Sequence, residues 1–383
     1  MPERDELSHG PLSGVRALVL GAGFGTRLRP LTEHVPKPVV PMLGRPLIGH
    51  PLIHLYGAGC WNAWVNAHYH PDRLAARLDP WVQRRLQRMR IEYSVEQPEI
   101  LGTGGACKKL EAELTQGGAP FLMLNGDAIL TMDLPGLWAT HQTGGGVATL
   151  LCIPRPDAAK YGAVVSVNAE GRILDFGGLG RLPGVTDAEV AACTPTVFCG
   201  VHVIEPSVLA VLPDGAFSGI VRQGYVPMLE RGADLRAHIL PEDVLFHDVG
   251  TAGRYLDAQE ELMSGTPFLP VPDGVDPMEA VFQEASFAVD ATGREYGNPD
   301  AVQGLASAML TPPFFFGPRN ELEPGARIGP GASLGALNRV GAGAVVQDAA
   351  LWAQVEVAPG ERMEGVIAGR FGGERLVVDG RPA

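Results

Sequence analysis

A six-residue repeat in the C-terminal part of the chain constrains its fold more than any other feature. Its aliphatic residues lie six positions apart: Leu322, Ile328, Leu334, Val340 and Val346. The spacing slips by one residue at Leu351 and then resumes at Val357 and Met363. Such a repeat is typical of a β-helix with three flat faces, in which the aliphatic side chains stack inward. A Gly-rich loop with chance spacing is the alternative, and five consecutive matches disfavour it. We expect two to three coils of about 18 residues each.

The first two thirds of the chain show a different pattern, in which short apolar runs alternate with helix-like stretches. The apolar runs are residues 15–20, 64–66, 91–95, 121–124, 147–153 and 197–204. Helix-like stretches lie between several of them, such as residues 71–90 and 104–114. Strands that alternate with helices predict a doubly wound, Rossmann-like α/β fold with a parallel or mixed sheet. We expect this domain at residues 11–264.

The residues between these two parts have no clear period. Residues 265–277 are rich in Pro and Gly, which is typical of a linker. We expect an irregular segment at residues 265–318 and the β-helix at residues 319–383. The apolar block TPPFFFGP, residues 311–318, is expected to dock the tail onto the first domain. Because the ends of a solenoid need a cap, the tail should pack on that domain or on another subunit, and we expect a homo-oligomer.

Charge and composition exclude several classes of protein. A formal net charge of -13 argues against a basic surface that could bind nucleic acid. No run of about 18 apolar residues suits a membrane span, and the polar start lacks the apolar core of a signal peptide. Five cysteines without CxxC spacing indicate neither a disulfide framework nor a zinc site. We therefore expect a cytoplasmic protein that binds neither nucleic acid nor membrane.

A Gly-rich segment, residues 20–38 (LGAGFGTRLRPLTEHVPKP), follows the first apolar run as a phosphate-binding loop does. Three glycines allow the backbone to approach a triphosphate closely: Gly21, Gly23 and Gly25. Arg27 offers a guanidinium fork, and Lys37, between two prolines, offers a second cation. A dinucleotide fingerprint needs Gly where Thr26 stands, and a Walker A loop needs a Gly-Lys-Ser/Thr sequence that is absent here. A tight turn without a ligand is the remaining alternative, and the added Arg and Lys disfavour it.

Two further motifs carry groups that suit a nucleotide site. The run GTGG at residues 102–105 can wrap a flat base with backbone groups, or it is only a strand-to-helix turn. Asp127 ends an apolar run, where α/β folds bind ligands, and Asp248 is a second isolated carboxylate. Two carboxylates from distant segments suit Mg²⁺, which takes few protein ligands besides substrate phosphates. Alone, either Asp is more typical of a turn or a helix cap.

Together these motifs resemble the nucleotidyltransferase family, also called nucleoside-diphosphate-sugar pyrophosphorylases. The family signature joins a Gly-rich loop to Gly-Thr-Arg-Leu, Pro-Leu-Thr and Pro-Lys-Pro, as residues 20–38 do. Further matches follow in the family order at residues 66–68, 101–106, 125–127, 161–162, 200 and 248–251. The resemblance implies a GT-A-like fold that joins a nucleoside triphosphate to a sugar 1-phosphate with Mg²⁺ and releases pyrophosphate.

The resemblance also assigns roles to individual residues. Arg27 and Lys37 are the catalytic pair, and Asp127 and Asp248 are the metal ligands. The nucleotide-binding residues are Leu20, Gly21, Ala22, Gly23, Gly25, Thr26, Glu96, Gly102, Thr103, Gly104 and Gly105. The sugar-phosphate-binding residues are Tyr161, Gly162 and Gly200.

One departure from the family concerns the sugar phosphate. Many relatives grip it with the Lys of a Glu-Lys-Pro sequence, and the corresponding residues 173–179 (ILDFGGL) contain no Lys. Arg172 or Arg222 could replace that Lys, and both are equally plausible as solvated surface charges.

The EQPEILGTGG stretch and a C-terminal left-handed β-helix resemble mannose-1-phosphate guanylyltransferases, which favours GTP and mannose 1-phosphate. A uridylyl- or thymidylyltransferase for glucose or N-acetylated sugar phosphates is the alternative. A catalytically weak regulatory subunit that binds sugar nucleotides is another. An acyltransferase is rejected, because none of the ten histidines lies in the repeat.

Overall fold

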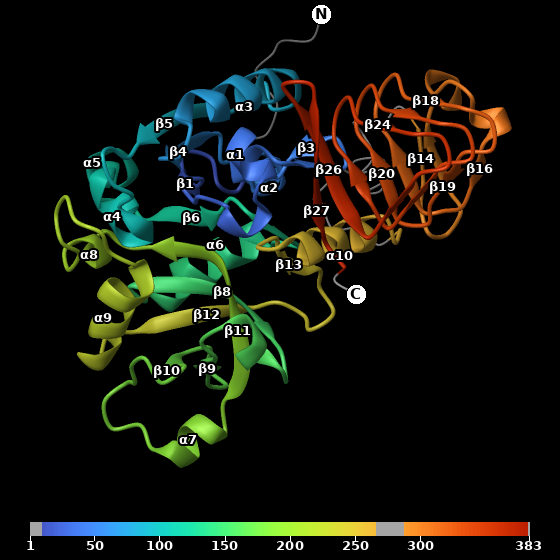
Figure 1. Cartoon of the computed structure of the whole chain (residues 1–383). Helices are drawn as coiled ribbons and strands as arrows, with labels where there is room; N and C mark the ends of the chain where they lie inside the picture. Colours follow the sequence, from blue (N-terminus) through green and yellow to red (C-terminus); the bar gives the residue numbers. More distant parts are fainter. Residues whose placement is uncertain (1–9, 266–286, 382–383) are drawn as a thin grey trace, which may run out of the picture.

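The computed structural model describes residues 10–265 and 287–381. An α/β domain comes first, and a β-helix follows and lies against it (Figure 1). None of the helices in the two described ranges is long and apolar enough to cross a lipid bilayer.

The centre of the first domain is a mixed sheet of nine strands within the described residues. Its strands are β1 (Arg16–Leu20), β4 (Asn62–Ala67), β5 (Arg90–Val95), β6 (Phe121–Asn125), β8 (Ala148–Pro154), β9 (Val165–Val167), β10 (Ile173–Phe176), β11 (Thr194–Ile204) and β12 (Leu235–Ile239). β6, β1, β4 and β5 are parallel neighbours, while β11 runs antiparallel to β6 and β8. The predicted Rossmann-like mixed sheet is therefore confirmed.

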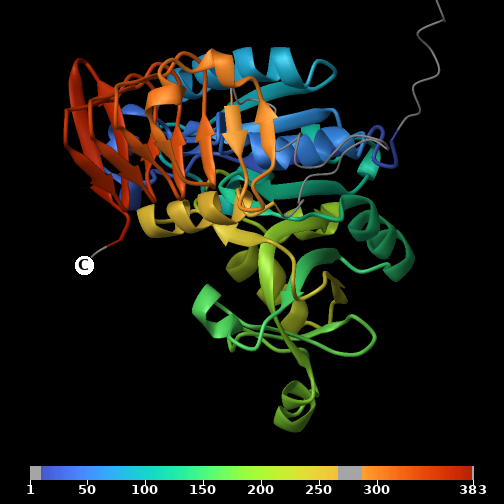
Figure 2. The same cartoon turned by 90° about the vertical axis from the view of Figure 1, so that its right-hand side faces the viewer.

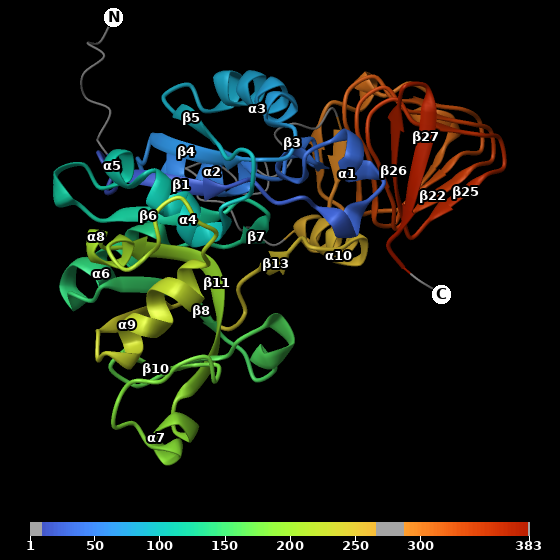
Figure 3. The ribbon, with the colours of Figure 1, turned by 60° about the vertical axis from the view of Figure 1, so that its left-hand side comes forward.

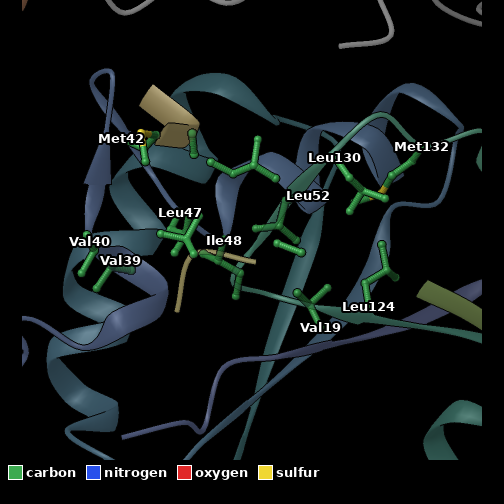
Figure 4. Close-up of a cluster of buried hydrophobic side chains, with 14 of the residues drawn as sticks. Val19, Val39, Val40, Met42, Leu47, Ile48, Leu52, Leu124, Leu130 and Met132 are labelled. Carbon is green, nitrogen blue, oxygen red and sulfur yellow. The ribbon is translucent and has the colours of Figure 1, made fainter. Parts of the chain in front are cut away.

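Helices cover both faces of this sheet. The longer ones are α2 (Gly49–Gly57), α3 (Pro71–Arg85), α4 (Gly102–Lys109), α6 (Leu134–Gly144) and α10 (Ala252–Leu262). Successive side chains of a strand point to opposite faces, so Val19 of β1 joins the core under α2 and α3, and Leu18 joins the core under α4. Figure 4 shows Val19 and Leu124 in the first of these cores, in one cluster with Ile48 and Leu52. Burial on both faces explains why β1 is a continuous apolar run.

Shorter elements fill the connections. The helical turns are η1 (Thr26–Leu28), α1 (Leu31–His34), η2 (Lys37–Val39), α5 (Glu111–Leu114), α7 (Asp187–Ala191), α8 (Pro206–Leu209), η5 (Ile220–Tyr225) and α9 (Val226–Glu230). The short strands are β2 (Pro41–Met42), β3 (Arg45–Pro46), β7 (Ala128–Leu130) and β13 (Phe246–Asp248). Two helix predictions were imprecise: the first helix ends at Arg85 rather than residue 90, and the second is divided at Leu110 into α4 and α5.

The C-terminal part is a β-helix with three sheets as its faces (Figure 2). One face holds β14 (Phe287–Val289), β15 (Glu295–Gly297), β17 (Phe314–Phe316), β20 (Ala332–Leu334), β23 (Ala350–Leu351), β26 (Val366–Phe371) and β27 (Glu374–Asp379). The second holds β16 (Met309–Leu310), β19 (Arg327–Ile328), β22 (Val345–Gln347) and β25 (Arg362–Glu364), and the third holds β18 (Glu321–Leu322), β21 (Arg339–Val340) and β24 (Glu356–Val357). Antiparallel strands close both ends of the first face and leave no open coil there.

The β-helix begins earlier than we expected. Residues 265–318 were predicted to be irregular, but β14 to β17 lie in that segment and belong to the β-helix sheets. Leu310 pairs with Ile328, and Phe316 pairs with Leu334, so the six-residue period extends back through 316 and 310. The period is hard to recognise in the sequence here, because position 316 is a Phe and four prolines lie nearby. Residues 266–286, where the predicted linker falls, lie outside the described residues.

The β-helix packs on the first domain, one of the two arrangements expected. Phe315 belongs to the core of the first domain, whereas Phe314 and Phe316 point into the β-helix. Only one of the three phenylalanines therefore makes the predicted docking contact. α1 and α10 lie beside β26 and β27 (Figure 3), and His34 stacks on Phe371 with ring centroids 4.6 Å apart.

A buried glutamine of α10 makes the polar part of this interface. Gln259 Nε2 donates to Gly331 O at 3.0 Å and to Ala349 O at 3.2 Å, and Ser333 Oγ donates to Gln259 Oε1 at 2.6 Å. Gln259 is 1% exposed, and the Ser333 hydroxyl has its hydrogen bond with Gln259 alone among the described residues. The two carbonyls also accept backbone N–H groups, Gly331 O from Ala349 and Ala349 O from Ser333.

Replacing Gln259 by Leu should lower the free energy of unfolding by about 2–3 kcal/mol, because the buried Ser333 hydroxyl would lose its acceptor and the two carbonyls would each lose one of their donors. Chemical denaturation of the full chain measures this. Gln83→Leu, at an exposed position of α3, is the matched control and should change stability by about 0.5 kcal/mol or less. Equal stability of the two variants would show that these hydrogen bonds do not hold the interface.

Candidate active site

A cavity of about 250 Å³ lies at the carboxyl ends of β1, β4 and β6. Its lining residues are Leu20, Gly21, Ala22, Gly23, Lys37, Pro38, Asn66, Ile100, Gly102, Thr103, Asn125 and Asp127. Eight of these twelve were predicted as site residues, and they come from four separate segments. The ligand sites of open α/β sheets lie at this edge.

A chain of buried hydrogen bonds connects the two Gly-rich segments behind this cavity. Gly21 N donates to Asn66 Oδ1, and Asn66 Nδ2 donates to Glu96 Oε1, each at 2.7 Å. Leu101 N donates to Glu96 Oε2 at 2.7 Å. Glu96 is fully buried and does not line the cavity, so it positions the loops and is not itself placed to contact a nucleotide. The Gly21 N–H therefore donates to Asn66 and is not available to a phosphate.

Glu96→Gln should therefore raise the KM for the nucleoside triphosphate roughly tenfold and change kcat less. Gln keeps one acceptor oxygen, so either Asn66 or Leu101 would lose its partner. Steady-state kinetics on the folded variant measure both constants. Glu92→Gln, at an exposed position of β5, is the control and should leave them unchanged. An unchanged KM in Glu96→Gln would show that the loops keep their positions without this chain of hydrogen bonds.

The second Gly-rich segment forms the start of α4 and is hydrogen-bonded to the loop around Ser218. Gly104 N donates to Ser218 O at 2.7 Å, and Ile220 N donates to Thr103 Oγ1 at 2.9 Å. A Cβ atom at Gly105 would lie 2.8 Å from Ala216 O, closer than side chains tolerate. Gly104 and Gly105, predicted to bind nucleotide, thus face this loop and not the cavity, which Gly102 and Thr103 do line.

A lysine and a carboxylate form an ion pair in the cavity, and a second carboxylate lies on the neighbouring strand. Lys37 Nζ lies 2.5 Å from Asp127 Oδ2, and the Lys37 side chain is almost entirely buried. β7 and β13 pair so that Asp248 lies opposite Ala128, and Val249 N donates to Asp127 O at 3.2 Å. The two predicted metal ligands are therefore neighbours.

Arg27 lies against the segment that follows Asp248. A Cβ atom at Gly250 would lie 2.6 Å from Arg27 Nη2, so the guanidinium rests against the backbone next to Asp248. Arg27 is exposed and forms no hydrogen bond or ion pair within the described part of the chain. Gly25 has a φ of 64°, and a Cβ there would lie 2.9 Å from Lys37 Cβ. The lining of the cavity does not include Gly25, Thr26 or Arg27. The absence of a Cβ atom at Gly25 leaves room for the side chain of Lys37.

The carboxylates fit a divalent cation that takes few protein ligands. Asp127 uses Oδ2 for Lys37, and Asp248 uses Oδ2 for Arg254 at 3.0 Å, while neither Oδ1 has a partner among the described residues. Both side chains are partly exposed. Residues 10–265 and 287–381 contain no group of three or more His, Cys, Asp or Glu that could hold a metal. Two carboxylates that share an ion with phosphates are the arrangement typical of Mg²⁺.

The residues predicted for the sugar side are separated. Tyr161 lines a second cavity of about 420 Å³ together with Asp248. Gly162 follows it with a φ of 133° and lines neither cavity. Gly200, with a φ of 75°, faces Asn125, whose side-chain amide any Cβ at position 200 would overlap. Gly200 thus makes room for Asn125 in the first cavity.

Four lining residues of the first cavity were not predicted: Pro38, Asn66, Ile100 and Asn125. The two asparagines stand near the ends of apolar strands, a signal that could have identified them. Arg172 pairs with Asp234 at 3.2 Å, and neither it nor Arg222 lines either cavity, so neither replaces the missing family Lys there.

The cysteines offer no reactive thiolate. Burial raises the pKa of Cys60 to about 12 and that of Cys152 to about 12, and it also raises the pKa of Cys107, Cys193 and Cys199. At neutral pH all five thiols stay protonated, and the thiolate is the nucleophilic form.

Residues 16–177 match the family model described as nucleotidyl transferase. This segment belongs to the nucleotidyl transferase family. Among curated relatives, the chain is 35% identical over 196 residues to the mannose-1-phosphate guanyltransferase of Aspergillus fumigatus, a match that covers 51% of this chain and 50% of that protein. It is 36% identical over 162 residues to the mannose-1-phosphate guanylyltransferase catalytic subunit beta of Dictyostelium discoideum, covering 42% and 44%. In these matches the chain spans about half or less of the relatives' length.

A longer match has lower identity. The UTP–glucose-1-phosphate uridylyltransferase of Synechocystis is 26% identical over 376 residues, which cover 93% of this chain and 88% of that protein. Among solved structures, HddC from Yersinia pseudotuberculosis superposes with a TM-score of 0.50 at 19% identity, over 64% of this chain and 99% of that one. This likeness shows that the fold of the nucleotidyl transferase segment is shared.

Proposed function

We propose that this protein is a sugar-1-phosphate nucleotidyltransferase, which joins a nucleoside triphosphate to a sugar 1-phosphate and releases pyrophosphate. The observation that carries the proposal is the ion pair of Lys37 with Asp127 in the cavity that the Gly-rich loop lines, with Asp248 on the strand paired next to Asp127. The first cavity offers a place for the nucleotide, and the second offers one for the sugar phosphate.

In this reaction the site residues would mainly position the substrates and neutralise their charge. An oxygen of the sugar phosphate attacks the α-phosphorus in line, and pyrophosphate leaves. No general base is required, because the attacking phosphate is already ionised. Lys37 and Arg27 would stabilise the charge that develops on the triphosphate. Asp127 and Asp248 would hold Mg²⁺, which neutralises phosphate oxygens when bound.

The cavity suggests how the nucleotide binds. A Cβ placed at Gly23 would meet no heavy atom within 4 Å, so this part of the loop is open to phosphates. Leu20, Ala22, Gly102 and Thr103 line the same space, where they would surround the remainder of the nucleotide.

For the substrates we propose GTP and mannose 1-phosphate, because relatives that are 30–36% identical over about half of this chain carry that activity in their names. The second candidate, UTP with glucose 1-phosphate, is favoured by the one relative described above that matches 93% of the chain.

A panel assay on the full chain tests these proposals. GTP, UTP and dTTP are each combined with mannose, glucose and N-acetylglucosamine 1-phosphate, and pyrophosphate release is followed. We expect the highest kcat/KM for GTP with mannose 1-phosphate. A higher value for UTP with glucose 1-phosphate would establish the second candidate. Sugar-nucleotide binding without pyrophosphate release from any pair would contradict the enzymatic function and indicate a regulatory subunit.

A further inference from the structure

The second cavity is lined by one of the two proposed metal ligands. Asp248 lines the second cavity and Asp127 lines the first, and β13 pairs with β7 so that Asp248 lies opposite Ala128, the residue that follows Asp127. A phosphate bound in the second cavity would therefore lie in the same cavity as the proposed metal ligand Asp248. No residue of the family's Glu-Lys-Pro type is available to hold it there, because residues 173–179 contain no Lys.

Three cationic side chains line the second cavity, and two of them are already paired. Arg254 forms an ion pair with Asp248 at 3.0 Å, and Lys160 forms one with Asp157 at 3.3 Å. Arg155 forms no ion pair within the described residues. Its only hydrogen bond there from the side chain is a long one, from Nη2 to Val244 O at 3.5 Å.

One nitrogen of the Arg155 guanidinium lacks a hydrogen-bond acceptor among the described residues. Its Nε is buried and has no hydrogen-bond partner in the described part of the chain. Buried donors without a partner are rare in folded proteins, because each one costs the free energy of its lost hydration. An anion in the second cavity would supply the missing acceptor, and a guanidinium fork matches the geometry of phosphate oxygens.

Some carboxylates of the second cavity have partners and others have none among the described residues. Asp257 pairs with Arg381, and His247 Nε2 lies 2.6 Å from Glu261 Oε2. Glu242 and Asp243 are exposed, and neither has a partner among the described residues. These two carboxylates are acceptors suited to the hydroxyl groups of a sugar.

We propose that Arg155 binds the phosphate of the sugar 1-phosphate in place of the missing family Lys, and that Glu242 and Asp243 accept hydrogen bonds from the sugar. The assignment rests on the proposed function, since it presumes that the second cavity receives this substrate. Arg155 directly follows β8, whose end at Pro154 brings it to the cavity.

Direct binding to the full chain tests the assignment without turnover. Mannose 1-phosphate and glucose 1-phosphate are titrated calorimetrically against wild type, Arg155→Met and Lys160→Met. We expect the dissociation constant of the sugar phosphates to rise tenfold or more in Arg155→Met, because a charge-assisted hydrogen bond is lost. Lys160→Met removes a cation from the same cavity that is paired and exposed, and it should change the constant less than twofold. Affinity for GTP and UTP should be unchanged in both.

Arg155→Lys keeps the charge but not the fork, and it should weaken binding by a smaller factor. Unchanged affinity in Arg155→Met overturns the assignment, as does unchanged affinity in Arg155→Lys if the Met variant does not fold. An equal loss in Lys160→Met also overturns it, because general cavity charge would then explain binding. Absence of sugar phosphate binding to wild type overturns it as well. Failure of the proposed function is a separate result, namely that wild type binds sugar phosphate but releases no pyrophosphate.

Discussion

Asp127→Asn and Asp248→Asn are each expected to lower kcat by roughly 100- to 1000-fold, because the metal that these carboxylates would hold contributes several kcal/mol to the transition state. Asn keeps the shape of the side chain and loses its charge. Turnover of wild type should require added Mg²⁺ or Mn²⁺ and stop in excess chelator, and binding of Mn²⁺ should weaken in both variants. Pyrophosphate release and a direct metal titration measure the two effects.

The exposed Asp72 of α3 provides the control, and Asp72→Asn should retain full activity. Asp127→Asn leaves the buried ammonium of Lys37 without its ion-pair partner, so a lower melting temperature is expected for this variant. Its kinetics are therefore measured well below the melting temperature. Full wild-type activity in the presence of chelator would remove the metal from the proposal.

Arg27→Ala should lower kcat by roughly 100-fold, as the loss of one group that stabilises developing charge typically does. The guanidinium is exposed, rests against Gly250 and has no partner in the described residues, so its removal should cost little stability. Steady-state kinetics and a melting curve measure both.

Arg29→Ala is the matched control, since Arg29 is exposed two positions away and, within the described residues, its side chain pairs only with Glu33, at 3.7 Å. It should leave kcat unchanged. A second variant approaches Arg27 from the other side: Gly250→Ala would place a Cβ 2.6 Å from Arg27 Nη2 and displace the guanidinium. Near-wild-type kcat in Arg27→Ala would exclude this residue from catalysis.

Several features of the fold could be predicted from the sequence because they depend on local patterns. Buried parallel strands are continuous apolar runs, so β1 was predicted to within one residue. The β-helix followed from a six-residue period, and the structure explains the slip at Leu351. Leu334 and Leu351 pair across neighbouring coils only 17 positions apart, whereas Phe316 and Leu334 are 18 apart. The early start of the β-helix was missed because the period was followed through aliphatic residues only.

The motif of residues 20–38 likewise supplies half of the residues that line the first cavity, among them Gly21, Gly23 and Lys37. The function of Glu96 could not be read from the same pattern. Whether a carboxylate faces a ligand or accepts two buried hydrogen bonds depends on Asn66 and Leu101, which other segments bring to it. The environment of Gly104 and Gly105 was not predictable for a similar reason, because the backbone that they face belongs to a loop more than 100 positions away.

The sequence by itself thus determined the two-part architecture, six of the nine strands that the structure describes in the sheet and the six-residue period of the coils. Only the tertiary structure decided which of those residues meet. β7 and β13 are three residues long each, too short to predict, yet their pairing places Asp248 beside Asp127. The same holds for Arg155, an ordinary charged residue in the sequence, whose buried Nε and position in the same cavity as Asp248 depend on how distant segments pack. Periodicity reports the environment along one element, while a site depends on side chains from several elements that only packing brings together.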